Sequence, residues 1–273
     1  MKKIVIMGAT SGIGLNVAER LARKGWMVGV AGRRDSVMQL LAEKYPGRVV
    51  WRHIDITRPE AGQSLRKLVD KLGGMDVYFH ISGVGYENDN LDPTLELATV
   101  RTNVTGFTRM IDEAYRYFRD ERHGRGHIAA ITSVAGTRGI GRLAAYSATK
   151  AYQQTYLTAL NQLARIEHLK IKFSDIRPGW IRTPLLDNDY EYPLTMTLPY
   201  AVPLIVKALK HKQRVAYIDW RWGMLVALWR LIPDWIWVRI PMKINTPASP
   251  VATRSNALNA ADGEIPTSQP TIQ

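Results

Sequence analysis

Three glycines follow the first apolar segment of the chain, and this pattern strongly limits the folds open to it. Residues 3–7, KIVIM, are predicted to form a buried strand, and GATSGIG then leads into an amphipathic helix that ends near Lys24. Gly8 permits a tight turn, and Gly12 lets the backbone approach a ligand closely. The helix N-terminus adds free N–H groups, so the pattern favours a pyrophosphate site over an ordinary glycine-rich turn.

Strand-like and helix-like segments alternate along the rest of the chain. Further strands are predicted at 26–31, 48–54, 76–81, 128–131, 171–176 and 214–218. Helices are predicted between them, including one from Pro59 to Leu72 and one from Tyr200 to Lys210. Alternation of this kind predicts an α/β domain with right-handed crossovers and a parallel sheet.

A possible proton-transfer group lies between Gly126 and Lys150. Ser133 follows a predicted strand end, and Tyr146 and Lys150 are four residues apart on a predicted helix, so their side chains share one face. A phenol with an ordinary pKa of about 10 exchanges protons poorly at neutral pH, and a neighbouring ammonium is expected to lower that pKa. A hydroxyl such as that of Ser133 can hold a substrate oxygen whose charge changes.

At these residues the chain resembles the classical short-chain dehydrogenase/reductase family, which carries Tyr-x-x-x-Lys with a serine thirteen residues before the tyrosine. The glycine spacing G-x-x-x-G-x-G, the pair Asp55-Ile56, Asn103 and the run Pro178-Gly179-x-x-x-Thr183 also match, in family order. The resemblance covers about residues 3–218. It implies a single doubly wound Rossmann-type domain with a seven-stranded parallel sheet.

The resemblance also implies roles for particular residues. Tyr146 would exchange a proton with substrate, Ser133 would hold the substrate oxygen, Lys150 would assist the phenol and bind the nicotinamide ribose, and Asn103 would hold a relay water. The implied cofactor contacts are Gly8, Thr10, Ser11, Gly12, Ile13, Gly14, Arg33, Arg34, Asp55, Ile56, Gly83, Tyr146, Lys150, Pro178, Gly179, Ile181 and Thr183.

The end of the second predicted strand bears on the choice of cofactor. An acidic residue there would bind the adenosine ribose hydroxyls of NAD, whereas arginine would accommodate the 2′-phosphate of NADP. Gly32 stands at that position and Arg33 and Arg34 follow, so NADP(H) is preferred and NAD(H) remains possible. Asp35 could reach the ribose, but its simpler role is to cap the next helix.

One family motif is altered. After the fourth strand the family has Asn-Asn-Ala-Gly, whereas this chain has His80-Ile81-Ser82-Gly83, and only the glycine is kept. The hydrogen bonds of those asparagines must therefore be supplied otherwise. His80 is expected to be a packed, hydrogen-bonded residue at the end of a buried strand rather than a catalytic one.

The segment 184–198 occupies the place where the family closes a lid over substrate. Its apolar or amphipathic side chains either line a site for a large apolar ketone or alcohol, such as a steroid or lipid, or pack the lid onto the sheet. These side chains are Leu185, Leu186, Tyr190, Tyr192, Met196 and Leu198.

Residues 220–244 form an apolar extension rich in tryptophan and arginine, beyond a catalytic domain expected at 1–219. Its longest uncharged run, 222–229, is too short to span a membrane. Tryptophans beside arginines suit a membrane surface, reached through 220–241, but an oligomer contact or a cap over the substrate is an open alternative. Residues 245–273 are expected to be a disordered tail.

Composition limits the remaining possibilities. The net charge is +13, but the basic residues are dispersed, which favours an anionic cofactor over nucleic acid. There are no cysteines and the six histidines lack ligand spacing, so no bound metal is expected. No signal-peptide core precedes Thr10, so a cytoplasmic location, possibly peripheral at the inner face of a membrane, is expected. A homodimer or homotetramer is expected by resemblance. A non-catalytic dinucleotide-binding regulatory or scaffold protein is the alternative function.

Overall fold

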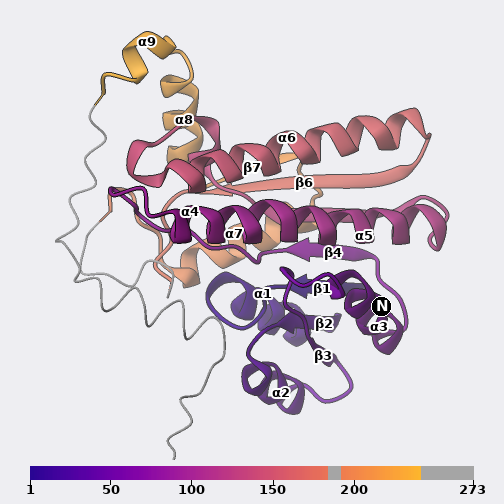
Figure 1. Cartoon of the computed structure of the whole chain (residues 1–273). Coiled ribbons are helices and arrows are strands. Elements are labelled where there is room, and N and C mark those ends of the chain that lie inside the picture. The colour runs from indigo at the N-terminus through magenta and orange to yellow at the C-terminus, as the bar shows by residue number, and fades with distance from the viewer. Residues whose placement is uncertain (184–191, 241–273) are drawn as a thin grey trace, which may run out of the picture. The chain divides into compact units, whose positions relative to one another are not determined.

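The computed structural model describes residues 1–183 and 192–240 and confirms the predicted architecture (Figure 1). Seven strands form one sheet in the order β3-β2-β1-β4-β5-β6-β7, and every neighbouring pair is parallel. The strands are β1 (Lys3–Met7), β2 (Met27–Gly32), β3 (Val49–His53), β4 (Val77–His80), β5 (Arg125–Ile131), β6 (Lys170–Pro178) and β7 (Val215–Ile218). Each lies within two or three residues of its predicted position.

Helices connect the strands as the alternation predicts. The α-helices are α1 (Gly12–Arg23), α2 (Asp35–Lys44), α3 (Ala61–Leu72), α4 (Pro93–Val100), α5 (Phe107–Asp120), α6 (Ala144–Ile166), α7 (Leu198–Lys210), α8 (Trp220–Trp229) and α9 (Asp234–Trp237). A π-helical turn, η1 (Arg101–Gly106), joins α4 to α5, and two 3-10 turns, η2 (Val134–Thr137) and η3 (Gly141–Leu143), precede α6.

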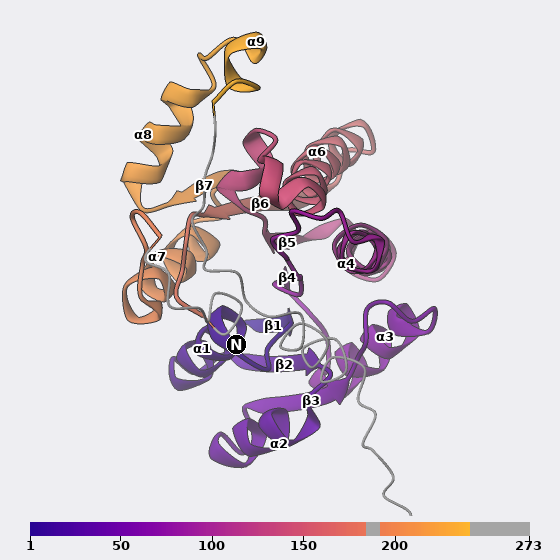
Figure 2. The same ribbon diagram turned by 60° about the vertical axis from the view of Figure 1, so that its left-hand side comes forward.

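The strand β1 shows why the sheet is covered on both faces (Figure 2). Ile4 and Ile6 pack into one apolar cluster with side chains of α1 and α7, while Val5 and Met7 pack into a second cluster with α3, α5 and α6. Successive strand residues point to opposite faces, so a nearly continuous apolar run is what a strand buried on both faces requires. The two clusters are the two sides of a doubly wound fold.

The strand order changes direction beside β1. The chain runs outward from β1 through β2 to β3, then returns to place β4 on the other side of β1. In such sheets the crevice at the carboxyl ends of the strands, at this switch point, is where ligands bind. Gly8 follows β1 and Ile81 follows β4, and the backbone N–H groups of Ile81 and Ser82 both donate to Met7 O.

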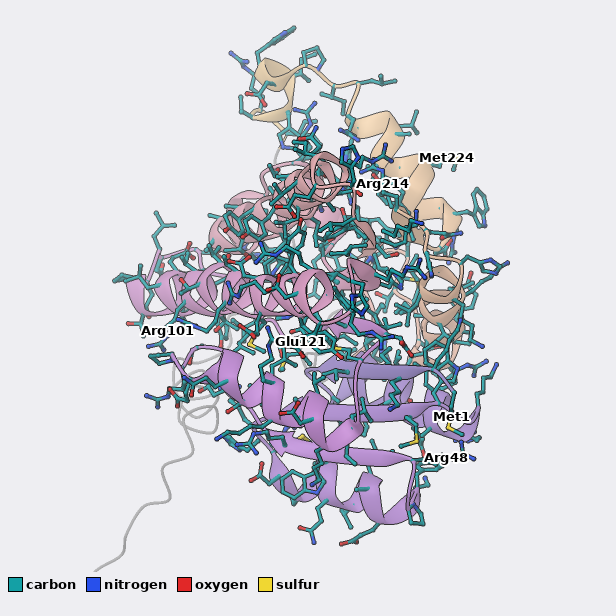
Figure 3. The ribbon with its side chains drawn as sticks, turned by 90° about the vertical axis from the view of Figure 1, so that its right-hand side faces the viewer. Met1, Arg48, Arg101, Glu121, Arg214 and Met224 are labelled. Atoms are coloured by element: carbon teal, nitrogen blue, oxygen red, sulfur yellow. The ribbon has the colours of Figure 1, made fainter. Side chains whose placement is uncertain are left out.

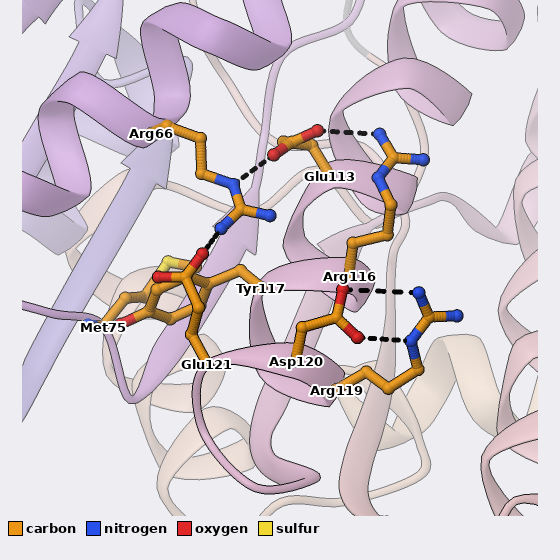
Figure 4. Close-up of polar contacts among 8 residues, drawn as sticks. All are labelled: Arg66, Met75, Glu113, Arg116, Tyr117, Arg119, Asp120 and Glu121. Carbon is orange, nitrogen blue, oxygen red and sulfur yellow. Dashed lines mark hydrogen bonds and ion pairs between the residues drawn. The ribbon is translucent and has the colours of Figure 1, made fainter.

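Helices α3 and α5 pack into the same apolar cluster, and polar contacts between them are drawn in Figure 4. The Arg66 guanidinium contacts both Glu113 and Glu121, and Glu113 also accepts from Arg116 at 2.7 Å. Since these side chains are partly exposed, each ion pair stabilises the fold only modestly. They link α5 to α3, and α5 continues directly from the η1 turn.

Candidate active site

Two glycines of the glycine-rich segment after β1, Gly8 and Gly14, have no room for a side chain. Gly8 has φ +92°, and a Cβ added to it would lie 2.6 Å from the backbone N of Ser82. A Cβ on Gly14 would lie 2.0 Å from Gly8 O, so Gly14 keeps α1 tight against the turn. Ser11 precedes α1 without capping it through its side chain, and the first turn of α1 contains no acidic residue. Its N–H groups therefore suit a bound anion.

A groove with an empty volume of about 950 Å³, including space open to solvent, runs along the carboxyl ends of the strands. Eleven predicted cofactor residues line it: Gly8, Thr10, Ser11, Gly12, Ile13, Arg33, Arg34, Asp55, Ile56, Gly83 and Thr183. Gly14, Tyr146, Lys150, Pro178, Gly179 and Ile181 are not among its lining residues. The glycine cradle, the free helix terminus and the two arginines fit a phosphate-containing dinucleotide.

The end of β2 carries positive rather than negative charge into this groove. A Cβ on Gly32 would lie 2.6 Å from Cγ2 of Thr10, so an acidic side chain there would displace Thr10. Arg34 donates to Thr10 Oγ1 at 3.0 Å through Nη2. The expectation that Asp35 caps α2 is wrong, because Arg34 is the N-cap and the Asp35 carboxylate instead contacts His53 Nδ1 at 2.8 Å.

Asp55 remains ionised at the end of β3. Burial acts to raise its pKa, but hydrogen bonds from the N–H and Oγ1 of Thr57, at 2.9 and 2.8 Å, and the charges of Arg33 and Arg58 lower the pKa overall. A fixed carboxylate beside Ile56 is thus available at the groove wall.

The predicted catalytic residues are brought together beyond β5. The Ser133 hydroxyl lies beside Tyr146 and acts to lower the pKa of the phenol, and Lys150 Nζ lies 5.6 Å from the centre of the Tyr146 ring. Lys150 is 4% exposed and donates to Ile131 O at 3.2 Å. Gly83, at the inner end of the groove, would place a Cβ 3.5 Å from Lys150 Nζ, so the groove leads to this group.

The direction of the Tyr146 pKa shift differs from the prediction. Burial raises the pKa of Tyr146, and the neighbouring Ser133 hydroxyl lowers it by less. Burial also lowers the pKa of Lys150 to about 8, opposed by Asp175. The phenol is therefore less acidic than an ordinary tyrosine, not more acidic. Tyr146 is a neutral proton donor at neutral pH.

Asn103 lies in the π-helical turn η1 and is fully buried. Its side chain accepts from Val84 N–H at 2.9 Å and donates to Val84 O at 2.7 Å and Thr149 Oγ1 at 3.1 Å. These bonds tie the loop after β4 to α6. The backbone oxygen of Asn103 accepts a further bond, 2.9 Å long, from Gln153 Nε2.

His80 is the buried, packed residue that was predicted. It is 1% exposed, its Nδ1 lies 3.0 Å from Tyr78 Oη, and its ring contacts Phe107 edge-on. Burial, with a smaller effect from the Lys150 charge, lowers the pKa of His80 to about 3. The imidazole is therefore neutral at physiological pH and bears no charge toward the site.

The loop after β6 is covered by the C-terminal extension. A Cβ on Gly179 would lie 2.0 Å from Cε2 of Trp222, so the glycine is needed for indole packing. Ile181 bridges to Met196, and both are buried in the core. The Tyr192 ring stacks on Trp180 at 4.4 Å.

Among the predicted lid residues, Tyr192 and Met196 are buried and Leu198 packs against the core, which favours lid packing for these three. Leu185, Leu186 and Tyr190 lie outside the described residues.

Two site residues were missed by the sequence interpretation. A Cβ on Gly85 would lie 2.5 Å from Cδ2 of Tyr146, so only glycine lets the loop pass the phenol. Gln153 contacts Lys150 and is completely buried. A second glycine two residues after Gly83, and a polar residue on the inner face of α6, were the available signals.

A doubly wound sheet with a dinucleotide groove leading to a serine, tyrosine and lysine defines a nicotinamide-dependent oxidoreductase. Comparison with known proteins agrees, because the short chain dehydrogenase family model matches residues 2–192. The chain belongs to the short-chain dehydrogenase/reductase family and is an enzyme that acts on CH–OH groups with NAD(P).

Two curated relatives illustrate the family. An uncharacterized oxidoreductase of Myxococcus xanthus is 27% identical over 237 residues, covering 84% of this chain and 92% of that protein. A 3-ketodihydrosphingosine reductase of Bacteroides thetaiotaomicron is 30% identical over 193 residues, covering 68% of this chain and 66% of that protein.

Two solved structures are also similar. A single-residue variant of actinorhodin polyketide ketoreductase with NADPH is 28% identical with a TM-score of 0.60, covering 67% of this chain and 72% of its own. A 3-ketoacyl-(acyl-carrier-protein) reductase from Brucella melitensis complexed with NADH is 22% identical with a TM-score of 0.70, covering 80% and 96%; this similarity concerns the fold.

Proposed function

We propose that the protein is an NADP(H)-dependent reductase that converts a ketone on an apolar molecule to a secondary alcohol, or catalyses the reverse oxidation. The observation that carries the proposal is the group formed by Tyr146, with Lys150 Nζ 5.6 Å from its ring and the Ser133 hydroxyl beside it, at the inner end of the groove. The names of the ketoreductase relatives support the reaction class.

The preference for NADP(H) is supported by the cations at the end of β2. Arg33 and Arg34 would hold the 2′-phosphate, the turn around Gly12 would hold the pyrophosphate, and Lys150 would hold the nicotinamide ribose. The bound nicotinamide supplies or accepts a hydride. Pro178, Gly179, Ile181 and Thr183 belong to the loop that would flank the nicotinamide, and among these Thr183 lines the groove.

The chain's own residues account for the proton and the developing charge. Ser133 would hold the carbonyl oxygen by a hydrogen bond, and Tyr146 would give its phenolic proton to that oxygen. Because burial raises the pKa of Tyr146, the phenol is protonated and ready to donate at neutral pH. Asn103 would hold the relay water, and its side chain fixes the loop after β4.

The reductase proposal is tested by following NADPH and NADH oxidation against ketones of increasing size and apolarity. Turnover of large apolar ketones with NADPH preferred is the expected result. Cofactor binding without turnover of any ketone would favour the non-catalytic alternative, and turnover of small polar ketones alone would overturn the apolar-substrate part.

We also propose that the protein forms a homo-oligomer, and light scattering would measure its mass in solution.

A further inference from the structure

Helix α8, in the extension after β7, has one buried apolar face and one exposed apolar face. Trp222, Val226 and Trp229 of α8 are buried against the domain, whereas Trp220, Met224 and Leu228 are 71%, 53% and 59% exposed. At about 100° per residue the two sets lie on opposite sides of the helix. Met224 lies on the outer side of α8 in Figure 3.

The buried face of the extension is attached by hydrogen bonds to residues 137–139, which follow Ser133. Trp229 Nε1 donates to Thr137 Oγ1 at 2.9 Å, and Trp237 Nε1 donates to Gly139 O at 2.8 Å. Arg138 donates to Arg230 O at 3.2 Å and also pairs with Asp234. These contacts hold the extension on the segment that follows Ser133, so the exposed face is a fixed surface.

Arginines border the exposed face. Arg221 and Arg230 fall at about 100° and about 280° on the scale that places Trp220 at zero, one on each side of the apolar stripe. In the segment after α8, Leu231, Trp235 and Val238 are also exposed, at 79%, 64% and 70%, and the Arg239 guanidinium lies 5.8 Å from the Trp235 ring. We call Trp220, Met224, Leu228, Leu231, Trp235 and Val238 the outer face.

We propose that the outer face binds the surface of a membrane containing anionic lipid. Exposed tryptophans bordered by arginines match the headgroup boundary, where indoles and cations both settle while side-chain stems reach the acyl region. A second copy fits less well, since a two-fold contact centred here would bring the arginines of both copies together. None of the helices in the described part of the chain has the length and apolar character of a membrane span.

The membrane proposal is tested by flotation of the full chain with vesicles of phosphatidylcholine alone or mixed with phosphatidylglycerol. The wild type should float with the mixed vesicles. The triple variant Trp220→Gln, Met224→Gln, Leu228→Gln should bind at least about tenfold more weakly, because three apolar side chains no longer enter the membrane surface. Arg230→Glu should weaken binding to the mixed vesicles, and the remaining binding should depend less on salt concentration. Leu40→Gln, at a residue 64% exposed on α2, is the matched control and should bind normally.

Three results would overturn the membrane proposal. The first is wild-type protein that does not float with either vesicle, and the second is a triple variant that floats like wild type. The third is a triple variant that changes from oligomer to monomer in light scattering without lipid, which would assign the face to a second copy. NADPH binding by each variant confirms folding, so none of these results bears on the reductase proposal.

An independent observation concerns Gln153, a completely buried residue one turn after Lys150 on α6. Its Oε1 accepts from Lys150 Nζ at 3.1 Å, and its Nε2 donates to Asn103 O at 2.9 Å. A π-helical turn leaves a carbonyl available for a side chain, and such turns occur often at functional sites. The oxygen and the nitrogen of the Gln153 amide therefore connect the Lys150 ammonium to the η1 turn.

We infer that Gln153 is a positioning residue that holds the Lys150 ammonium for cofactor and substrate chemistry, which rests on the proposed function. The other charged or titratable groups around Lys150 are Tyr146 on α6, Asp175 on β6 and His80 on β4. The acceptors identified for Nζ, Gln153 Oε1 and Ile131 O, are uncharged. Replacing the amide therefore changes both the position and the protonation of the lysine.

The Gln153 inference is tested by 13C NMR titration of Lys150 in the protein without cofactor, together with the pH profile of kcat. Gln153→Leu should shift the Lys150 titration to lower pH and Gln153→Glu to higher pH, with the alkaline limb of kcat moving in the same order. Leu160→Ala, in the apolar part of α6, should lower stability and leave both titrations unchanged. Unmoved Lys150 titration in both Gln153 variants would overturn the inference, and because NMR needs no turnover, this outcome is separate from failure of the reductase proposal.

Discussion

Gly85 passes the ring of Tyr146 so closely that a Cβ added to the glycine would lie 2.5 Å from Cδ2 of the phenol. The loop after β4 and the start of α6 therefore meet directly at the proposed proton donor. Their packing sets how far the phenol projects toward substrate.

Gly85→Ala should consequently displace the ring. Overpacking costs about 1–3 kcal/mol, and the same displacement of a proton donor should lower kcat at least about tenfold. Steady-state kinetics and fluorescence titration with NADPH measure the two effects, and cofactor affinity should stay near wild type. Gly141→Ala is the control, since a Cβ there would have no atom within 4 Å. Unchanged kcat in Gly85→Ala would show that the loop does not position Tyr146.

Arg34 should control the preference between cofactors. Removing its charge in Arg34→Ala would forfeit a charge-assisted contact worth about 1.5–3 kcal/mol, so KM for NADPH should rise about tenfold or more. KM for NADH should change little, because NADH lacks the 2′-phosphate. Arg23→Ala, at an exposed arginine paired with Glu19 on α1, serves as the control. An equal rise for both cofactors would contradict the assignment of Arg34 to the phosphate.

His80 should make the fold sensitive to acid. Its pKa is lowered from 6.5 to about 3 by burial, so the unfolded chain binds a proton that the folded protein rejects between these values. The free energy of unfolding should therefore be at its full value above pH 6.5 and fall as the pH drops toward 3, by up to about 1.4 kcal/mol per pH unit for one proton. Urea unfolding of His80→Asn should show a shallower decline, and an unchanged slope would contradict burial of a neutral imidazole.

Local spacing explains what the sequence alone could predict. The glycine turn, the strand ends and the Tyr146 and Lys150 pair depend on residues close in sequence, where the strand and helix periods decide which side chains meet. The Asp35 side chain contacts His53 and does not cap α2, because β3 lies beside β2. No local sequence pattern predicts this contact.

Other features depend on contacts between distant segments. Trp222 packs against Gly179, and Gln153 donates to Asn103 O, although the members of each pair are far apart in the sequence. The direction of the Tyr146 pKa shift likewise depends on how deeply the fold buries the hydroxyl, a quantity that spacing to Lys150 does not contain. The contact of Arg138 with the extension could not be predicted either, because it joins residues far apart in the sequence.

The central claim is that Tyr146 supplies the proton for carbonyl reduction, and Tyr146→Phe tests it most directly. The measurement is the single-turnover rate of NADPH oxidation with a ketone that the wild type reduces, alongside NADPH affinity. Removing the hydroxyl should slow the reaction by about 10²–10⁴-fold, the usual contribution of a positioned general acid, while NADPH still binds. A rate within a few-fold of wild type, with NADPH bound, would contradict the claim.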